Sequence, residues 1–450
     1  MNNFSESQKE VFEKYLKNEN IFITGPGGSG KSYLIKYIYY HATEVNYKNI
    51  KICALTGCAS ILLGCKATTL HRFAGIGLAN KSIDEVVNFV FKNKYKLKAW
   101  YSLDTLIIDE VSMMSLKLLL ILDKIARKIY NKPKLPFGGL QVIFSGDFYQ
   151  LPPVSSKDEE LEASMFCFEH ELWNQIFPKE NQIILKTIFR QKDDNFLKIL
   201  KYVRQGKITP TTKKMLEDKV YNDEQLDKIR EEKVVTIINP YRKDTDYINN
   251  KYYNELPKDA EKNTYNLRYL KLGTKNQNIN DVISRLDLTD DSMSYEYDFM
   301  ANNIMADKSI ELKVGTYVMC IANVALECEN PIVNGSQGIV VGFKNGLPLV
   351  KFNNIKEPLV VDYYTWTSEK NKKLGVSQIP LIYAWAITIH KSQGVTLDNA
   401  IMDIGKKIFE YGQSYVALSR VKSLDGLYLT NFDYTKIMAN PKVKKFYGDI

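Results

Sequence analysis

Short apolar runs alternate with amphipathic segments through the first 155 residues of the chain. Four of these runs predict buried strands, at Asn20–Thr24, Ile50–Leu55, Thr105–Asp109 and Leu140–Ser145. Between them, apolar residues recur at helical spacing in Lys31–His41 and Leu116–Ile129. Strands that alternate with helices favour βαβ units and a parallel sheet, whose ligands bind at the carboxyl ends of the strands. The pattern therefore predicts an α/β fold with a site at that edge.

The pattern changes twice in the second half of the chain. Three short strands, joined by turns at Asn334-Gly335 and Asn345-Gly346, predict a small antiparallel β module at Thr316–Ile321, Gln337–Phe343 and Leu347–Phe352. Before and after this module the α/β pattern returns, with strands expected at Val234–Ile238, Tyr383–Ile389 and Asn399–Asp403. We therefore expect a first α/β domain over residues 1–185 and a second over 186–299 and 376–450, with the β module of 300–375 inserted in the second.

The composition favours a globular protein and argues against a membrane-spanning or secreted one. The 450 residues are 45% hydrophobic and 25% charged, as in ordinary globular proteins, and no apolar run is long enough to span a bilayer. The N-terminus resembles neither a secretory nor a mitochondrial signal, so a soluble intracellular protein is expected. Six cysteines without a C-x-x-C pair and four histidines argue against a structural metal. A net charge of +9 favours a polyanionic partner.

One segment predicts a phosphate site. Gly25-Pro26-Gly27-Gly28-Ser29-Gly30-Lys31-Ser32 matches G-x-x-x-x-G-K-[ST] directly after a predicted strand and before a predicted helix. In such a loop the glycines and Ser29 let backbone N–H groups surround the phosphates of ATP. Lys31 would bridge the β- and γ-phosphates, and the Ser32 hydroxyl would bind Mg²⁺. The alternative is a flexible glycine turn without a ligand.

Polar residues after two other predicted strands complete this expected site. Asp109 would hold Mg²⁺, and the adjacent Glu110 would polarise the attacking water as general base. Gln150, in the loop after Leu140–Ser145, could contact the γ-phosphate or that water. Taken alone, Asp109 and Glu110 could simply mark a strand that enters a turn. Gln150 could be a surface residue without a function.

Arginine is rare in this chain, with nine among the 61 basic residues. Each arginine is therefore a candidate for a role that needs a planar guanidinium, such as two parallel hydrogen bonds to a phosphate. Arg190 opens the second α/β region and Arg420 lies near its end. An arginine reaching across a domain cleft to the γ-phosphate would stabilise the transition state of hydrolysis. A structural salt bridge is the alternative for either residue.

Taken in order, these segments resemble the motifs of the PIF family of DNA helicases, a branch of helicase superfamily 1. The resemblance rests on Gln8, the P-loop, Ala54–Ser60, Thr69–Gly77, Asp109–Met113, Gly146–Pro153, Phe189-Arg190-Gln191, Val333–Gly338, Ile389–Asp398 and Tyr415–Val421. It implies two RecA-like P-loop NTPase domains with ATP between them, a β-rich accessory module, and a small insertion at about residues 75–100.

The resemblance also implies a function. An ATP- and Mg²⁺-dependent 5′→3′ DNA helicase is expected, which translocates as a monomer on single-stranded DNA, unwinds forked duplexes and serves replication, repair or recombination. It would act in the nucleus or cytoplasm, wherever its DNA is. A DNA-stimulated translocase that remodels nucleoprotein without unwinding, an RNA helicase and a non-enzymatic binding subunit are the alternatives.

Further site residues follow from the same resemblance. Gln8 would read adenine, and Gly394 would contact the nucleotide. Single strands bind through cationic grooves and stacking faces, and the candidates for this contact are Thr56, His71, Phe73, His390 and Lys391. Core packing is the alternative for His71 and Phe73.

Overall fold

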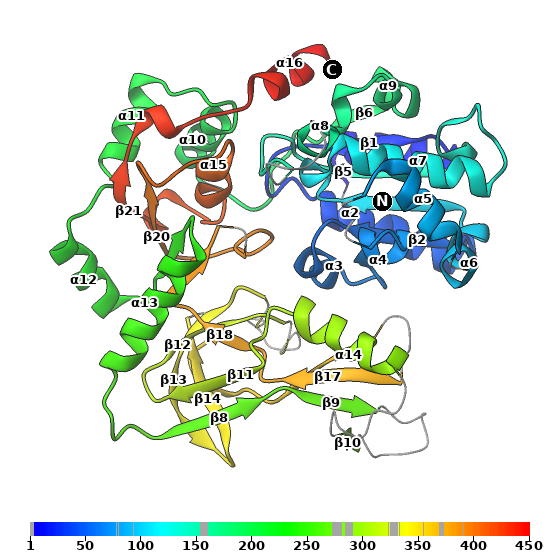
Figure 1. Ribbon diagram of the computed structural model, residues 1–450. Helices are drawn as coiled ribbons and strands as arrows, with labels where there is room; N and C mark the ends of the chain where they lie inside the picture. Colours follow the sequence, from blue (N-terminus) through cyan, green and yellow to red (C-terminus); the bar gives the residue numbers. More distant parts are fainter. Residues whose placement is uncertain are drawn as a thin grey trace. The chain divides into compact units, whose positions relative to one another are not determined.

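Figure 1 shows the computed structural model of the chain, which describes residues 4–77, 79, 81–92, 94–153, 161–271, 281–283, 291–322, 324, 332, 334–353, 355–368, 373–389 and 391–450. The chain divides into two compact units. The first consists of Met1–Thr209, Phe409–Val416 and Ile437–Ile450, and the second of Pro210–Ile408 and Ala417–Lys436.

The first unit is built on a parallel sheet of six strands in the order β3-β2-β4-β5-β1-β6. The strands are β1 (Ile21–Thr24), β2 (Ile50–Ala54), β3 (Thr68–Thr69), β4 (Thr105–Asp109), β5 (Gln141–Gly146) and β6 (Gln182–Ile184). The four strands predicted for this region are therefore confirmed to within one residue at each end. Every described side chain of β1, β4 and β5 is buried, which explains their continuous apolar runs.

Helices surround this sheet. They are α1 (Glu6–Leu16), α2 (Lys31–Tyr40), α3 (Gly57–Leu63), α4 (Leu70–Ala74), α5 (Ile83–Lys92), α6 (Lys94–Tyr101), α7 (Leu116–Ile129), α8 (Leu161–Ser164), α9 (Leu172–Ile176), α10 (Asp194–Arg204) and α16 (Pro441–Asp449). The two predicted helices, α2 and α7, are confirmed. Helices α5 and α6 occupy the region of the expected small insertion, and Val86, Val90 and Trp100 join them to the core.

The first unit extends past the predicted domain boundary at residue 185. Helix α10 belongs to it because Arg204, at its end, forms an ion pair with Asp147 just after β5. Two C-terminal segments also return to it, and Gly206 packs so tightly on the last of them that a Cβ there would lie 2.4 Å from the backbone N of Ala439. These long-range contacts were not visible in the local pattern.

The second unit contains a parallel sheet in the order β19-β7-β20-β21. Its strands are β7 (Thr236–Asn239), β19 (Ala386–Thr388), β20 (Ala400–Ile404) and β21 (Leu427–Phe432). The accompanying helices are α11 (Pro210–Glu217), α12 (Asp223–Glu232) and α13 (Arg242–Glu255). Helix α15 (Gln413–Leu418) belongs to the first unit up to Val416 and to the second from Ala417. The strands predicted at Val234–Ile238 and Asn399–Asp403 are thus present, with shifted ends, whereas the predicted strand Tyr383–Ile389 is divided: Tyr383 ends β18 (Leu381–Tyr383), and β19 begins at Ala386.

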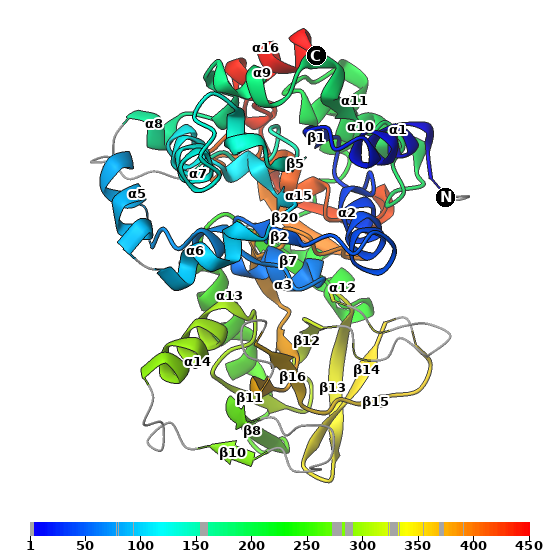
Figure 2. The same ribbon diagram turned by 90° about the vertical axis from the view of Figure 1, so that its right-hand side faces the viewer.

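Strands are present at the three segments predicted for the β module, and its antiparallel strands extend from Lys262 to Tyr383, beyond the expected bounds of 300–375. Its antiparallel strands are β8 (Lys262–Asn266), β9 (Arg268–Lys271), β10 (Asp281–Ile283), β11 (Ser309–Lys313), β12 (Tyr317–Cys320), β13 (Gln337–Lys344), β14 (Leu347–Phe352), β15 (Leu359–Val360), β16 (Tyr364–Thr367), β17 (Leu374–Gln378) and β18 (Leu381–Tyr383), with helix α14 (Asp291–Asn303) among them. Strands β13, β14 and β15 lie side by side (Figure 2), and with β12 and β18 they form a sheet in the order β15-β14-β13-β12-β18. Strand β8 is mostly polar and exposed, so its sequence carries no apolar signal.

An aromatic cluster forms much of the core of the first unit. The fully buried Trp173 ring lies 4.9 Å from Phe22, 4.8 Å from Phe177 and 5.6 Å from Phe148, measured between centroids. Aromatic pairs at such distances add to the free energy already gained by burying their area.

Replacing Trp173 should therefore destabilise the first unit strongly. Trp173→Ala is expected to lower the free energy of unfolding by about 3–5 kcal/mol, through lost burial and a cavity. Urea unfolding followed by circular dichroism measures the change, and Phe89→Ala, at a 57% exposed position, serves as the control. A loss of less than about 1 kcal/mol, typical of surface substitutions, would contradict this assignment of the core.

Candidate active site

The P-loop lies between β1 and α2, as predicted. Gly25, Gly28 and Gly30 adopt positive φ angles of 150°, 83° and 82°. A Cβ at Gly28 would lie 2.5 Å from the Cβ of Arg190, and one at Gly30 would lie 2.8 Å from Nε2 of Gln8. Glycine is therefore required here by backbone conformation and by close packing together. No side chain caps the N-terminus of α2, so its first N–H groups are available to an anion.

Lys31 is the first residue of α2, and its ammonium folds back onto the loop. Its Nζ donates to the carbonyl oxygens of Gly25 at 2.7 Å and Pro26 at 3.1 Å. Burial lowers its pKa, while the negative charges of Asp147, Glu110 and Asp109 act in the opposite direction. A cation surrounded by loop carbonyls and carboxylates is well placed to bind phosphate oxygens as well.

The two predicted acids lie at the end of β4. Asp109 is 5% exposed, and burial raises its pKa, whereas a hydrogen bond from the Ser32 hydroxyl acts to lower it. Glu110 has a φ of 59°, a left-handed conformation that is uncommon for a residue with a side chain and that tends to cluster at active sites. The structure thus brings Ser32, Asp109 and Lys31 together, as the sequence predicted.

Gln150 lies in the loop that follows β5. Its side chain is buried, and its backbone N donates to the carbonyl of Asp147 at 2.8 Å. The returning segment of residues 409–416 packs on this loop, where a Cβ at Gly412 would lie 2.5 Å from the carbonyl oxygen of Gln150. Gln150 is therefore held in a closely packed loop and is not an idle surface residue.

Arg190 belongs to the first unit, not to the second α/β region in which the sequence placed it. The backbone N of Phe189 donates to the carbonyl of Gly28 at 2.8 Å, which holds this segment against the P-loop. Burial lowers the pKa of the Arg190 guanidinium, and the Tyr415 hydroxyl and Glu110 act to raise it. Arg190 thus shares one electrostatic environment with the acids after β4.

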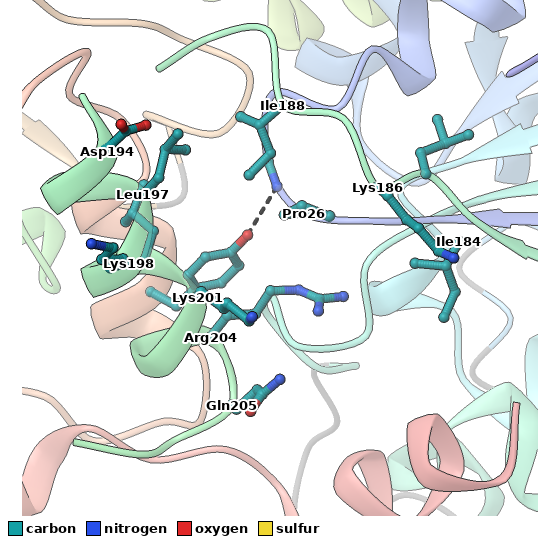
Figure 3. Close-up of a pocket in the computed structure, with 14 residues that line it drawn as sticks. Pro26, Ile184, Lys186, Ile188, Asp194, Leu197, Lys198, Lys201, Arg204 and Gln205 are labelled. Atoms are coloured by element: carbon teal, nitrogen blue, oxygen red, sulfur yellow. Dashed lines mark hydrogen bonds between the residues drawn. The ribbon is translucent and has the colours of Figure 1, made fainter. Parts of the chain in front are cut away.

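A cavity of about 590 Å³ opens beside the P-loop, and Figure 3 shows its wall. One side is formed by Pro26, Gly27 and Tyr415, where the backbone N of Gly27 donates to the Tyr415 hydroxyl at 2.9 Å. The other side is formed by α10, with Arg204 pointing inward in Figure 3. The cavity is thus lined by P-loop residues Pro26 and Gly27 and by basic side chains, among them Arg204.

The predicted DNA contacts in the first unit have different environments. Thr56 is half-buried, and its hydroxyl oxygen accepts a hydrogen bond from the backbone N of Ala59 at 3.2 Å, near the start of α3. His71 is also half-buried, and burial lowers its pKa, so its imidazole is held neutral. Phe73 is 7% exposed and packs on Trp100 at 4.7 Å. Core packing therefore accounts for Phe73, and its ring is not a free face for a DNA base.

In the second unit the candidates follow strand β19. Lys391 is exposed, and its backbone N donates to the Thr388 hydroxyl at 3.1 Å. Gly394 is exposed with a φ of 82°. Arg420 is 2% exposed, and its guanidinium donates to the Ser392 carbonyl at 3.4 Å and the Ser419 hydroxyl at 2.5 Å. The prediction for His390 falls outside the described residues.

Comparison with known proteins places this architecture in a family. The model of the PIF1-like helicase family matches residues 3–214. The crystal structure of the Pif1 helicase from Candida albicans is 31% identical and superposes with a TM-score of 0.71, over 99% of this chain and 99% of that one. The chain belongs to the PIF1-like helicase family. The predicted α/β fold with RecA-like parallel sheets is thereby confirmed.

This chain is also similar to other members of the PIF1-like helicase family. Unliganded Pif1 from Bacteroides is 26% identical with a TM-score of 0.77, over 99% of this chain and 96% of that one. The ATP-dependent DNA helicase PIF1 of Rattus norvegicus is 33% identical over 450 residues, which cover 99% of this chain and 64% of the relative. The chain thus spans just under two thirds of the length of this curated relative.

The structure also shows residues around the P-loop that sequence reasoning missed, namely Asp147, Tyr149, Arg204, Tyr415 and Tyr447. The rarity of arginine was a signal that could have drawn attention to Arg204.

Among the described residues, no group of three or more His, Cys, Asp or Glu is arranged to hold a metal ion. Within the same residues, every helix is too short or too polar to cross a bilayer.

Proposed function

We propose that this chain is an ATP-dependent 5′→3′ DNA helicase that translocates on single-stranded DNA and unwinds duplexes. The observation that carries the proposal is the P-loop of the first unit, where Lys31 lies among the charges of Asp109, Glu110 and Asp147. Family membership supports it, since the relatives from rat and human are each named an ATP-dependent DNA helicase PIF1. A solved Pif1 from Bacteroides was obtained with ADP-AlF4.

The nucleotide would lie on the P-loop. The backbone N–H groups from Gly27 to Ser32 and the Lys31 ammonium would hold its phosphates. Gln8 would read the adenine through Nε2, since its Oε1 already accepts a hydrogen bond from the backbone N of Ser5 at 3.0 Å. Gly25 would start the phosphate-binding loop directly after β1. Gly394, in the second unit, would contact the nucleotide.

Two residues, one in α2 and one at the end of β4, are suited to Mg²⁺. Ser32 and Asp109 offer a hydroxyl and a carboxylate, the oxygen ligands that this ion prefers, and they are already close enough to hydrogen-bond. Mg²⁺ would neutralise charge on the phosphate oxygens. We propose that these two residues hold it.

Hydrolysis needs a base and positive charge at the γ-phosphate. Glu110 would accept a proton from the attacking water, and Gln150 would orient that water. Arg190 would stabilise the developing charge from within the same unit as the P-loop, and Arg420 would do so from the second unit. The fixed donors of such a site act where charge develops in the transition state.

We propose that DNA is bound by Thr56 and His71 of the first unit and by His390 and Lys391 of the second. One solved Pif1 structure is described as bound to single-stranded DNA, and another concerns unwinding at forked duplexes by two coordinating helicases. A single copy of this chain would translocate, with the β-rich part of residues 262–383 as accessory module. Its role would be in replication, repair or recombination, in the nucleus or cytoplasm.

Forked duplexes with a single 5′ or 3′ tail test this function directly. With Mg²⁺ and ATP, we expect unwinding of the 5′-tailed substrate alone. Glu110→Gln should lower the rate by about 10²–10⁴, the usual contribution of a general base. Glu13→Gln, at an exposed position of α1, is the matched control.

Each other outcome overturns a defined part of the proposal. Unwinding from the 3′ tail would contradict the polarity. If neither substrate opens while DNA still stimulates ATP hydrolysis, the protein is a translocase. Full activity of Glu110→Gln would remove Glu110 from the role of base.

A further inference from the structure

The C-terminal helix α16 packs against the first unit, close to α9 (Figures 1 and 2). The Phe446 ring lies 4.4 Å from Phe168, 5.4 Å from Phe148 and 6.0 Å from Trp173, measured between centroids. These apolar contacts are sufficient to dock the helix. They also bring the next residue, Tyr447, beside the loop that leads to Gln150.

The Tyr447 hydroxyl joins two segments of the nucleotide site. It lies 2.6 Å from Oγ1 of Thr24, the last residue of β1 before the P-loop. It also accepts a hydrogen bond from the backbone N of Phe148 at 3.1 Å and lies 3.4 Å from Oδ1 of Asp147. Burial raises the pKa of this phenol, so it stays protonated and can both donate and accept. One hydroxyl therefore connects the start of the P-loop with the start of the Gln150 loop.

Arg204 completes this cluster from α10. Its Nε and Nη2 each donate to the Asp147 carboxylate at 2.8 Å, in a two-pronged ion pair. Its guanidinium lies 4.6 Å from the Tyr149 ring and 5.2 Å from the Tyr447 ring, and these two rings stack at 4.8 Å. Burial lowers the pKa of Arg204, but the attraction of Asp147 outweighs it and raises the pKa overall, so the Arg204 guanidinium stays charged.

The cluster also acts on the catalytic lysine. Asp147 is fully buried and is the carboxylate that raises the pKa of Lys31 most strongly. A shift of the Asp147–Gln150 loop would therefore change the position of Gln150 and the field at Lys31 at the same time. Catalytic groups lose much of their effect when they move by about 1 Å.

We propose that Tyr447 is a positioning residue for ATP hydrolysis. Its hydroxyl fixes the Gln150 loop relative to the P-loop, while the rest of α16 supplies the packing that docks the helix. The inference rests on the proposed function, since it concerns the same nucleotide site. It makes the C-terminal helix part of the hydrolysis machinery of the first unit.

Tyr447→Phe separates these roles, because it removes the hydroxyl and keeps the ring that stacks on Tyr149. We expect kcat for DNA-stimulated ATP hydrolysis to fall about 10-fold with KM for ATP unchanged, the signature of an interaction that matters in the transition state. The midpoint of thermal unfolding should stay within about 3 °C of the wild type. Tyr434→Phe, at a tyrosine that is 50% exposed, is the matched control.

A second variant tests the hydrogen bond between the hydroxyls of Thr24 and Tyr447. Thr24→Val removes the partner hydroxyl at nearly constant volume, so the double variant should lose no more activity than the more affected single variant. Fully additive losses would show that the two hydroxyls act independently. Steady-state hydrolysis at saturating ATP and DNA supplies kcat for all three variants.

The outcomes distinguish this inference from the proposed function. A wild type that hydrolyses ATP with DNA, beside a Tyr447→Phe variant with the same kcat, overturns only the positioning role. A raised KM or a lower unfolding midpoint at unchanged kcat assigns the hydroxyl to nucleotide binding or to stability instead. A wild type without any hydrolysis overturns both proposals.

Discussion

Lys31→Ala is expected to lower DNA-stimulated ATP hydrolysis by about 10³-fold or more, since it removes a fixed positive charge from the phosphate site. The loss should be large because Asp109, Glu110 and Asp147 remain. Without the ammonium, these carboxylates would repel the phosphates that the loop must bind. Steady-state phosphate release in the presence of a single-stranded oligonucleotide measures the effect.

Binding of single-stranded DNA by the same variant should change by less than about twofold, because the proposed DNA contacts lie on other segments. Fluorescence anisotropy with a labelled oligonucleotide measures it at fixed salt, on which such affinities depend. Lys17→Ala, at an exposed lysine after α1, is the control for removing one positive charge. Equal loss of hydrolysis and DNA binding in Lys31→Ala would contradict the role given to Lys31.

Arg420→Ala should lower kcat by about 10³–10⁵, as loss of an arginine that stabilises charge on the transferred phosphoryl group does in studied NTPases. The affinity for ATP should fall by less than about threefold, because the arginine would act mainly in the transition state. Arg420→Lys should restore little, since lysine lacks the planar fork. Single-turnover hydrolysis and equilibrium binding of ATP separate the two effects.

The buried position of Arg420 requires a stability measurement beside the kinetics. Arg242→Ala, where the side chain is 83% exposed in the same unit, is the matched control. Unchanged turnover would remove Arg420 from the phosphate site. A lower unfolding midpoint that accounts for the loss of activity would assign it to packing around Ser392 and Ser419.

Local signals predicted where the P-loop and the acids at the end of β4 lie. The P-loop was recognisable because the backbone itself needs glycine at Gly28 and Gly30, where no side chain would fit beside Arg190 and Gln8. Asp109 and Glu110 were recognisable because they end a continuous apolar run, which is the buried strand β4. Both signals depend on residues that are adjacent in sequence, so one chain is enough to read them.

Other contacts could not be predicted because they join residues that are far apart in sequence. Phe73 resembled a stacking residue on a loop, yet the distant Trp100 covers its ring. Arg190 was expected across a cleft, yet the hydrogen bond between Phe189 and Gly28 holds its segment on the P-loop. Neither contact leaves a periodicity in the sequence.

The sequence by itself determined the α/β class, four of the six strands of the first parallel sheet and the position of the P-loop, since each follows from local patterning and backbone geometry. Only the tertiary structure decided that α10 and the C-terminal helix return to the first unit. Arg204 and Tyr447 reach Asp147 there across 57 and 300 residues of chain. Such contacts depend on which surfaces bury one another, and that is settled only when the whole chain packs.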